Sequence, residues 1–302
     1  MMKRMIILIL TLMLPIAALA DSAPTSGLLV TPFAEGTAEY TAAEAIAALL
    51  NRDVKILPGE NGAEAVNAML ADPETLLLDT QCALMLSLQG YTAADCREKM
   101  TPVCQLGAEP LCLVMSLDFA KALDVADYAG FAAYATDHEY ELLIPRYVDA
   151  GVVDYASWLM ENALPVLSET CFDLEEALDM LGDDSIQVMV VPASAVTDGM
   201  LPLCTLGAER SPLWPELPCA AELELPQCEG ITLSLYANAE ISPDAATEIA
   251  ETMAAASLSE ILAPAGFVTA VQGGEAFEAE TAATFADYAA YMTAEGLFFY
   301  EQ

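Results

Sequence analysis

Residues 203–223 constrain the fold more than any other part of the chain, because prolines interrupt this stretch and continue just beyond it. The prolines concerned are Pro212, Pro215, Pro218 and Pro226. Proline locks φ and lacks an N–H group, so this stretch cannot form a helix interior or a central strand. A strand-like apolar run, 201–206, leads in, and we expect a short helix around 220–225. The sequence therefore predicts a rigid, irregular connector between folded parts.

Elsewhere, apolar runs typical of strands alternate with segments that have helical periodicity. The expected strands are 27–31, 54–57, 75–79, 140–144, 165–167, 186–191 and 230–237. The expected helices are 42–50, 63–71, 119–135, 155–163, 174–181, 245–255 and 275–294. Ser242 before Pro243 is a typical helix start, with serine as the cap and proline in the first turn. This alternation predicts an α/β fold.

The N-terminus has the pattern of a cleavable secretory signal. Lys3 and Arg4 precede an apolar run, 5–14, and Ala18 and Ala20 form a small-x-small cleavage site. We expect residues 1–20 to be removed and the mature protein to be periplasmic. No cysteine follows the site directly, which argues against a lipoprotein anchor. No later stretch is long and apolar enough to predict a membrane span.

The charge balance argues against a nucleic-acid partner. The chain has 9 Lys and Arg against 46 Asp and Glu, a formal net charge of −37. Phosphate binding requires clustered basic side chains, which are missing. We interpret the acidic residues as a solubilising surface. The alternative, cation storage, lacks the support of a calcium-loop motif.

Eight cysteines all follow the expected cleavage site. They are Cys82, Cys96, Cys104, Cys112, Cys171, Cys204, Cys219 and Cys228. An even number in an oxidising compartment favours disulfides, and Cys219 with Cys228, both in or near the connector, is the pair we expect. Buried free thiols are the alternative. Zinc is disfavoured, because there is no C-x-x-C motif and His138 is the only histidine.

The connector carries a residue order that resembles the tripartite tricarboxylate transporter solute-binding proteins, the TctC-like or Bug family. Arg210 and Ser211 are followed by Pro215, Pro218 and Glu222 in the spacing of that family, with Cys219 in place of its threonine. Residues 102–115 resemble another family segment. The resemblance implies a two-lobed periplasmic binding protein fold of type II, with the ligand in a cleft between the lobes.

The same resemblance implies a discontinuous domain organisation. Residues 1–20 are the signal, 21–118 the first part of lobe I, 119–229 lobe II, and 230–302 a segment that returns to lobe I.

Candidate ligand-binding residues come from both expected lobes. In lobe I, the loop and helix start at Phe33, Ala34, Gly36, Thr37 and Ala38 match a family loop whose free N–H groups receive a carboxylate. A helix N-terminus suits an anion, although Glu35 and Glu39 lie nearby. Thr80 and Gln81 end a strand, where open α/β sheets bind ligands, and a plain turn is an equal alternative. A purely structural role for the Gly36 loop also stays open.

In lobe II, the resemblance places ligand loops after two strands and at the end of a third. The residues at these positions are Arg146, Tyr147, Glu169 and Ser194. A guanidinium can hold a carboxylate bidentately, so Arg146 is the expected ligand cation. The alternative is that Arg146 pairs with Asp149 or Glu141 at the surface.

The resemblance implies a solute-binding protein that captures a small organic acid or zwitterion and delivers it to the subunits of a tripartite tricarboxylate-type membrane transporter, without a cofactor or a metal. Two alternatives stay open. One is a degenerate paralogue that serves as a sensor or partner protein. The other is a carboxylate-based hydrolase, which the absence of catalytic motifs and the single histidine disfavour.

Overall fold

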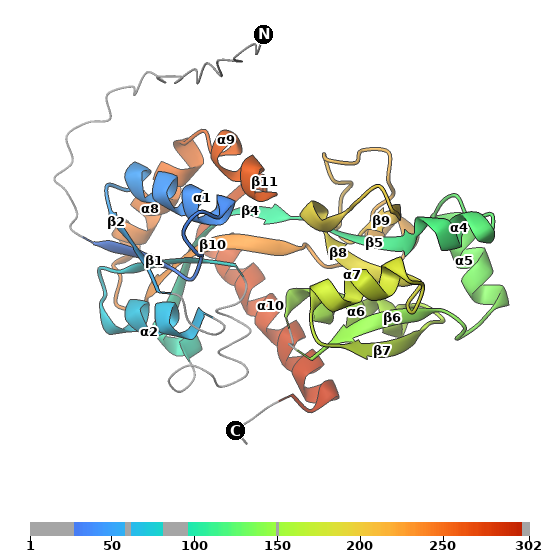
Figure 1. Ribbon diagram of the computed structural model, residues 1–302. Helices are drawn as coiled ribbons and strands as arrows, with labels where there is room; N and C mark the ends of the chain where they lie inside the picture. Colours follow the sequence, from blue (N-terminus) through green and yellow to red (C-terminus); the bar gives the residue numbers. More distant parts are fainter. Residues whose placement is uncertain (1–26, 58–61, 81–95, 149–150, 298–302) are drawn as a thin grey trace, which may run out of the picture.

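The chain folds into two α/β lobes, and the computed structural model describes residues 27–57, 62–80, 96–148 and 151–297 (Figure 1). The first lobe has a six-stranded sheet in the order β11-β4-β10-β3-β1-β2. The second lobe has strands in the order β8-β5-β9 and a parallel pair, β6 and β7. The Gln187 N–H donates to the Leu143 carbonyl at 3.2 Å, which joins this pair to the start of β8.

The elements follow the strand–helix alternation predicted from the sequence. The strands are β1 (Leu28–Thr31), β2 (Asp53–Ile56), β3 (Leu76–Asp79), β4 (Met100–Glu109), β5 (Leu111–Ser116), β6 (Leu143–Tyr147), β7 (Leu167–Cys171), β8 (Val188–Pro192), β9 (Met200–Thr205), β10 (Ile231–Asn238) and β11 (Val268–Gly273). The α-helices are α1 (Ala38–Leu49), α2 (Ala63–Ala71), α4 (Leu117–Ala122), α5 (Tyr128–Asp137), α6 (Val152–Ala163), α7 (Leu174–Gly182), α8 (Pro243–Ala255), α9 (Ser259–Leu262) and α10 (Gly274–Glu295). Short 3-10 turns are η2 (Cys96–Lys99), η3 (Ala193–Ala195), η4 (Ala220–Leu223) and η5 (Ala263–Ala265).

Several helices, α1 and α8 among them, begin at a short polar side chain that caps their first turn. The Ser242 side chain accepts a hydrogen bond from the Ala245 N–H at 3.2 Å and Pro243 begins α8, so the predicted start is confirmed. Thr37 caps α1 in the same way, accepting from the Tyr40 N–H at 3.1 Å. Such caps satisfy N–H groups that the helix itself leaves free.

The first-lobe sheet is covered on both faces. One apolar cluster joins Ile46 of α1, Met253 of α8 and Leu262 of α9 to one face. A second cluster joins Met69 of α2 and Phe277 of α10 to the opposite face. Figure 1 shows α1 and α8 on one side of this sheet and α2 and α10 on the other. Burial on both faces of this mixed sheet, in which β3 pairs parallel with β1 and antiparallel with β10, explains the continuous apolar run Leu76–Leu78.

The chain passes between the lobes at two neighbouring points. Outward, β4 ends at Glu109 and β5 begins at Leu111 in the second lobe. Inward, Gly230 precedes β10, which pairs antiparallel with both β3 and β4 of the first lobe. The expected first boundary, after residue 118, is too late, because β5 already pairs with β8 and β9. The outward crossing lies at Pro110.

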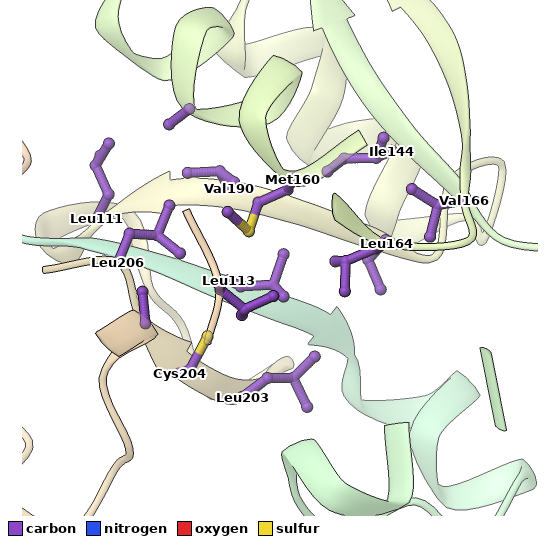
Figure 2. Close-up of a cluster of buried hydrophobic side chains, with 14 of the residues drawn as sticks. Leu111, Leu113, Ile144, Met160, Leu164, Val166, Val190, Leu203, Cys204 and Leu206 are labelled. Atoms are coloured by element: carbon purple, nitrogen blue, oxygen red, sulfur yellow. The ribbon is translucent and has the colours of Figure 1, made fainter. Parts of the chain in front are cut away.

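The second lobe has its own apolar core. Leu113 of β5, Val190 of β8 and Met160 of α6 are completely buried in one cluster. Figure 2 shows their side chains pointing toward one another. Leu203 and Cys204, on the neighbouring edge strand β9, belong to the same cluster. The α7 helix covers the opposite face through Ala177 and Leu181.

Helix α10 contributes to both lobes. Phe277, near its start, packs in the first-lobe cluster beneath the sheet. Tyr288, Tyr291 and Met292, near its end, pack in the second-lobe core. Figure 1 shows this helix running from below the first sheet toward α6. It is therefore a third physical link between lobes, in addition to the two crossing strands.

Three sequence expectations about elements are wrong. The single helix over 119–135 is two helices, because Asp124 has a positive φ of 59° and Asp127 caps the next helix. Strands β6 and β7 run to Tyr147 and Cys171, so the residues expected in loops are strand residues, paired in register from Leu143 with Leu167. Strands β4, β5 and β11 are not among the strands expected from the sequence. No helix within the described ranges is both long and apolar enough to cross a membrane.

Candidate ligand site

The carboxyl ends of β1 and β3 form the place in the first lobe where the strand order reverses. From β1 the chain moves outward through α1 to β2 and then returns through α2 to β3, on the other side of β1. Helices α1 and α2 lie on opposite faces of the sheet, because the chain leaves β1 through one and reaches β3 through the other. Open α/β sheets bind ligands at such a reversal. We call this place, defined by Thr31, Thr37, Gly62 and Asp79, the switch-point edge.

The loop after β1 leads into the N-terminus of α1. Thr37 holds its shape, since its N–H and hydroxyl both donate to the Ala34 carbonyl, at 3.2 and 2.9 Å. Gly36 has a φ of +87°, and a Cβ there would meet no atom within 4 Å. Phe33 packs on the α1-side cluster of the first lobe, and Ala38 is the first residue of α1. The first turn also contains Glu39, which opposes an anion at the helix end.

Asp79, the last residue of β3, is a buried carboxyl with one free oxygen. Its side chain is 1% exposed, and Oδ1 accepts from the Thr80 N–H at 2.7 Å. Oδ2 is buried and has no hydrogen-bond partner among the described residues. Burial raises the pKa of Asp79 to about 7, and the bonds from Thr80 only partly oppose this. The sequence analysis did not select Asp79, although a single acidic residue after the run Leu76–Leu78 is a signal that could have.

Arg146, at the carboxyl end of β6, is held by three carboxylates. Its Nε and Nη2 donate to Asp154 at 2.9 and 3.2 Å, Nη1 donates to Glu161 at 2.8 Å, and Nη2 also donates to Glu295 at 3.2 Å. Burial alone lowers the pKa of Arg146, but the bonds to Asp154 and the other two carboxylates raise it above its usual range. Of the two alternative surface partners, Glu141 pairs with His138 instead, and Asp149 lies outside the described residues.

Asp154 of α6 is the centre of this ion cluster. Its side chain is 2% exposed, and it also accepts bonds from the Tyr147 N–H, at 2.7 Å, and from the Tyr291 hydroxyl of α10. Burial and the neighbouring Asp154 raise the pKa of Tyr291. The cluster thus ties β6, α6 and the end of α10 together. Every nitrogen of the Arg146 guanidinium has a carboxylate partner, so a ligand at this position would have to displace one of them.

The remaining expected residues are dispersed. The Tyr147 hydroxyl is buried without a hydrogen-bond partner, and burial raises its pKa. Glu169 is in the middle of β7 and exposed. Ser194 lies at the crossing, where its N–H donates to Glu109 Oε1 at 2.8 Å. Gln81 lies outside the described residues.

The expected disulfide is wrong, because Cys219 and Cys228 are both free, buried thiols. The Cys219 Sγ donates to the Ala208 carbonyl at 3.4 Å within the connector. Cys228 instead faces the second-lobe core, where burial raises its pKa to about 11. No group of three or more potential ligands within the described ranges could hold a metal ion.

No family model and no curated protein matches the sequence, so the comparison depends on solved structures. A TctC solute-binding protein from Polaromonas has a TM-score of 0.75 and 18% identity, over 90% of this chain and all of that one. The periplasmic binding protein BugD has a TM-score of 0.62 and 16% identity, over 91% and 99%. MatC from Rhodopseudomonas palustris, with bound malate, has a TM-score of 0.60 and 19% identity, over 87% and 98%. The chain therefore has the two-lobed fold of the TctC and Bug periplasmic binding proteins.

Proposed function

We propose that this protein is an extracytoplasmic solute-binding protein that captures a small carboxylate-containing solute between its lobes. The observation that carries this proposal is the fold, which matches the TctC protein over the full length of that chain. The switch-point edge supports it, because α1 and α2 both begin there. The free N–H groups and the positive dipole end of a helix N-terminus favour an anionic ligand. Binding proteins with two lobes close around a ligand by a hinge motion.

Delivery to a tripartite tricarboxylate-type transporter in the membrane is the finer part of the proposal. The expected signal over residues 1–20 supports an exported protein, and sequencing the N-terminus of the protein recovered from the periplasm would test cleavage after Ala20. Uptake of radiolabelled solute in cells with and without this chain would test delivery. Equal uptake in both would contradict it.

The first experiment is a thermal-shift screen of the mature protein with malate, citrate, nicotinate and glucose. A ligand that binds only the folded state raises its stability, by about 2.7 kcal/mol at 100 times Kd. We expect a rise in Tm with at least one carboxylate and none with glucose. Gly36 has a φ of +87°, so Gly36→Val forces the loop after β1 out of its present shape, although a Cβ there would meet no atom within 4 Å. The variant should reduce the shift while circular dichroism stays normal. An unchanged shift in this variant would remove the loop after β1 from the site.

One set of observations favours a second candidate, a degenerate paralogue that acts as a sensor or partner protein. Glu39 opposes the helix end, and Arg146 is fully occupied by carboxylates. Both features weaken the electrostatic attraction of the site for an anionic ligand. A screen in which no carboxylate raises Tm would favour this candidate. The hydrolase alternative finds no support in the ion cluster, where each carboxylate is bonded to Arg146.

A further inference from the structure

Asp79 occupies the position at the switch-point edge that an anionic ligand would approach. It ends β3 beside Pro32, the first residue after β1, and beside Gly62, the N-cap of α2. A Cβ on Gly62 would lie 3.2 Å from Asp79 Oδ2 and 3.7 Å from Pro32 Cβ. The free carboxyl oxygen therefore lies against the N-terminus of α2, on the side where Pro32 follows β1.

The free oxygen is unusual on energetic grounds. A buried polar atom without a hydrogen bond costs free energy, so native proteins pair nearly all of them. Oδ1 of Asp79 is satisfied by the Thr80 N–H at 2.7 Å, whereas Oδ2 has no partner. The Asp79 carboxyl thus has one unused bonding position, beside the N-cap of α2 at Gly62.

We propose that Asp79, in its neutral form, donates a hydrogen bond from Oδ2 to the carboxylate of the bound solute, directly or through one water. This inference rests on the proposed function. It adds that the solute carboxylate binds only when Asp79 is protonated. An ionised Asp79 would repel a ligand carboxylate, and two carboxyl groups that share a site retain a proton between them. The chain would consequently take up a proton from solution when it binds an anionic solute.

The surroundings of Asp79 permit this protonation. Its pKa is raised to about 7, chiefly by burial, so the neutral form is well populated near neutral pH. Among the described residues, the titratable group nearest in the sheet is Tyr236 of β10, whose pKa is raised by burial and by the charge of Asp79. The charge of Glu280 of α10 also raises the pKa of Tyr236. Glu64 in the first turn of α2 is exposed. None of these groups offers Asp79 a positive charge.

Calorimetric titration with malate tests the proposal in wild type, Asp79→Asn and the control Asp53→Asn, which removes an exposed carboxylate on β2. Each protein is titrated at pH 6 and pH 8, in two buffers with different ionisation enthalpies. For a group of pKa near 7 that must be neutral, wild-type affinity falls about tenfold between these pH values. The heat should depend on the buffer as expected for proton uptake. Asp53→Asn should behave like wild type.

Asparagine is neutral at all pH values and also donates a hydrogen bond. Asp79→Asn should therefore bind malate at pH 8 about as tightly as wild type does at pH 6, with no buffer dependence. Loss of binding at both pH values in a folded variant would overturn the proposal, since an ionised Asp79 would then be required. Binding that falls with pH as in wild type would also overturn it and leave the proposed function intact. If wild type binds no carboxylate, the function and this inference fail together.

The wild-type measurement stands even if Asp79→Asn fails to fold. Proton uptake follows from the buffer dependence of the wild-type heats alone. Malate binding by wild type without proton uptake at pH 8 would overturn the proposal.

Discussion

Asp79 and Arg146 are both ionisable residues with largely buried side chains, but they differ in whether an opposite charge lies beside them. The Arg146 guanidinium has three carboxylate partners, while the Asp79 carboxyl has no cation and one free oxygen. Burying a charge is costly unless it is paired, so an unpaired group prefers its neutral form. Each residue leads to its own prediction about stability.

Asp79 should make the fold less stable as the pH rises. Its pKa in the folded state, about 7, is above the usual aspartate pKa of 3.8. A raised pKa contributes stability that is present at low pH and is lost as the pH rises through the folded value. Between pH 5 and pH 8 wild type should lose about 2–3 kcal/mol of unfolding free energy through this group, which Asp79→Asn should not lose. Urea unfolding at both pH values measures it, with Asp53→Asn as the control. Parallel pH profiles in Asp79→Asn and wild type would contradict the prediction.

Arg146→Met should destabilise the protein, because it leaves Asp154 buried without its cation. Removing one member of a buried ion pair costs about 3–5 kcal/mol. Lys121→Met is the matched control, since Lys121 and Asp118 form a pair whose side chains are 63% and 91% exposed. Such surface pairs contribute about 0–1 kcal/mol. Equal effects of the two substitutions in chemical denaturation would show that the Arg146 cluster has no special role.

At the scale of elements, the two crossing segments pack closely enough to restrict what can replace Gly230. This residue has a φ of +102°, and a Cβ there would lie 2.1 Å from the Glu109 carbonyl oxygen. Neither segment can move without shifting β4 or β10, which pair with each other from Ile231 to Asn238. The close approach of the two crossing segments thus requires a glycine at position 230.

Gly230→Ala should therefore lower the Tm strongly. A side chain forced into a positive φ costs of order 1–3 kcal/mol before any clash is counted. Gly151→Ala is the control, because Gly151 has a φ of −92° and a Cβ there would meet no atom within 4 Å. We expect a near-neutral effect for the control. A thermal melt in which both variants match wild type would mean that the crossing adapts to the added carbon.

The whole molecule carries a formal charge of −37, which matters for an anionic solute. Its long-range field repels a carboxylate, and salt screens that field, with a Debye length of about 30 Å at 0.01 M and about 8 Å at 0.15 M. Malate affinity should consequently increase between 10 and 150 mM NaCl, measured by calorimetry. A decrease would mean that attraction by a local cation outweighs the long-range repulsion, and Arg146 would then again be a candidate ligand-binding residue.

The fold class could be predicted from the sequence because it depends on local patterns. Apolar runs such as Leu76–Leu78, the Ser242–Pro243 helix start and the prolines of the connector act over a few residues, and each appears in the structure where expected. The resemblance in the connector identified the two-lobed fold, which the solved structures share. These features need no knowledge of which distant segments meet.

The candidate site depended on contacts between distant residues, and there tertiary structure decided. The sequence shows that Arg146 follows an apolar run. Its ion pairs with Asp154, Glu161 and Glu295 depend on how distant segments fold together. Cys219 and Cys228 are close in sequence, yet one faces the connector and the other the core. Asp79 reads as an ordinary strand end until β1, α2 and β10 enclose it. Burial and charge pairing are properties of the assembled chain, because desolvation depends on every neighbour at once, whereas secondary structure depends mainly on the nearest residues.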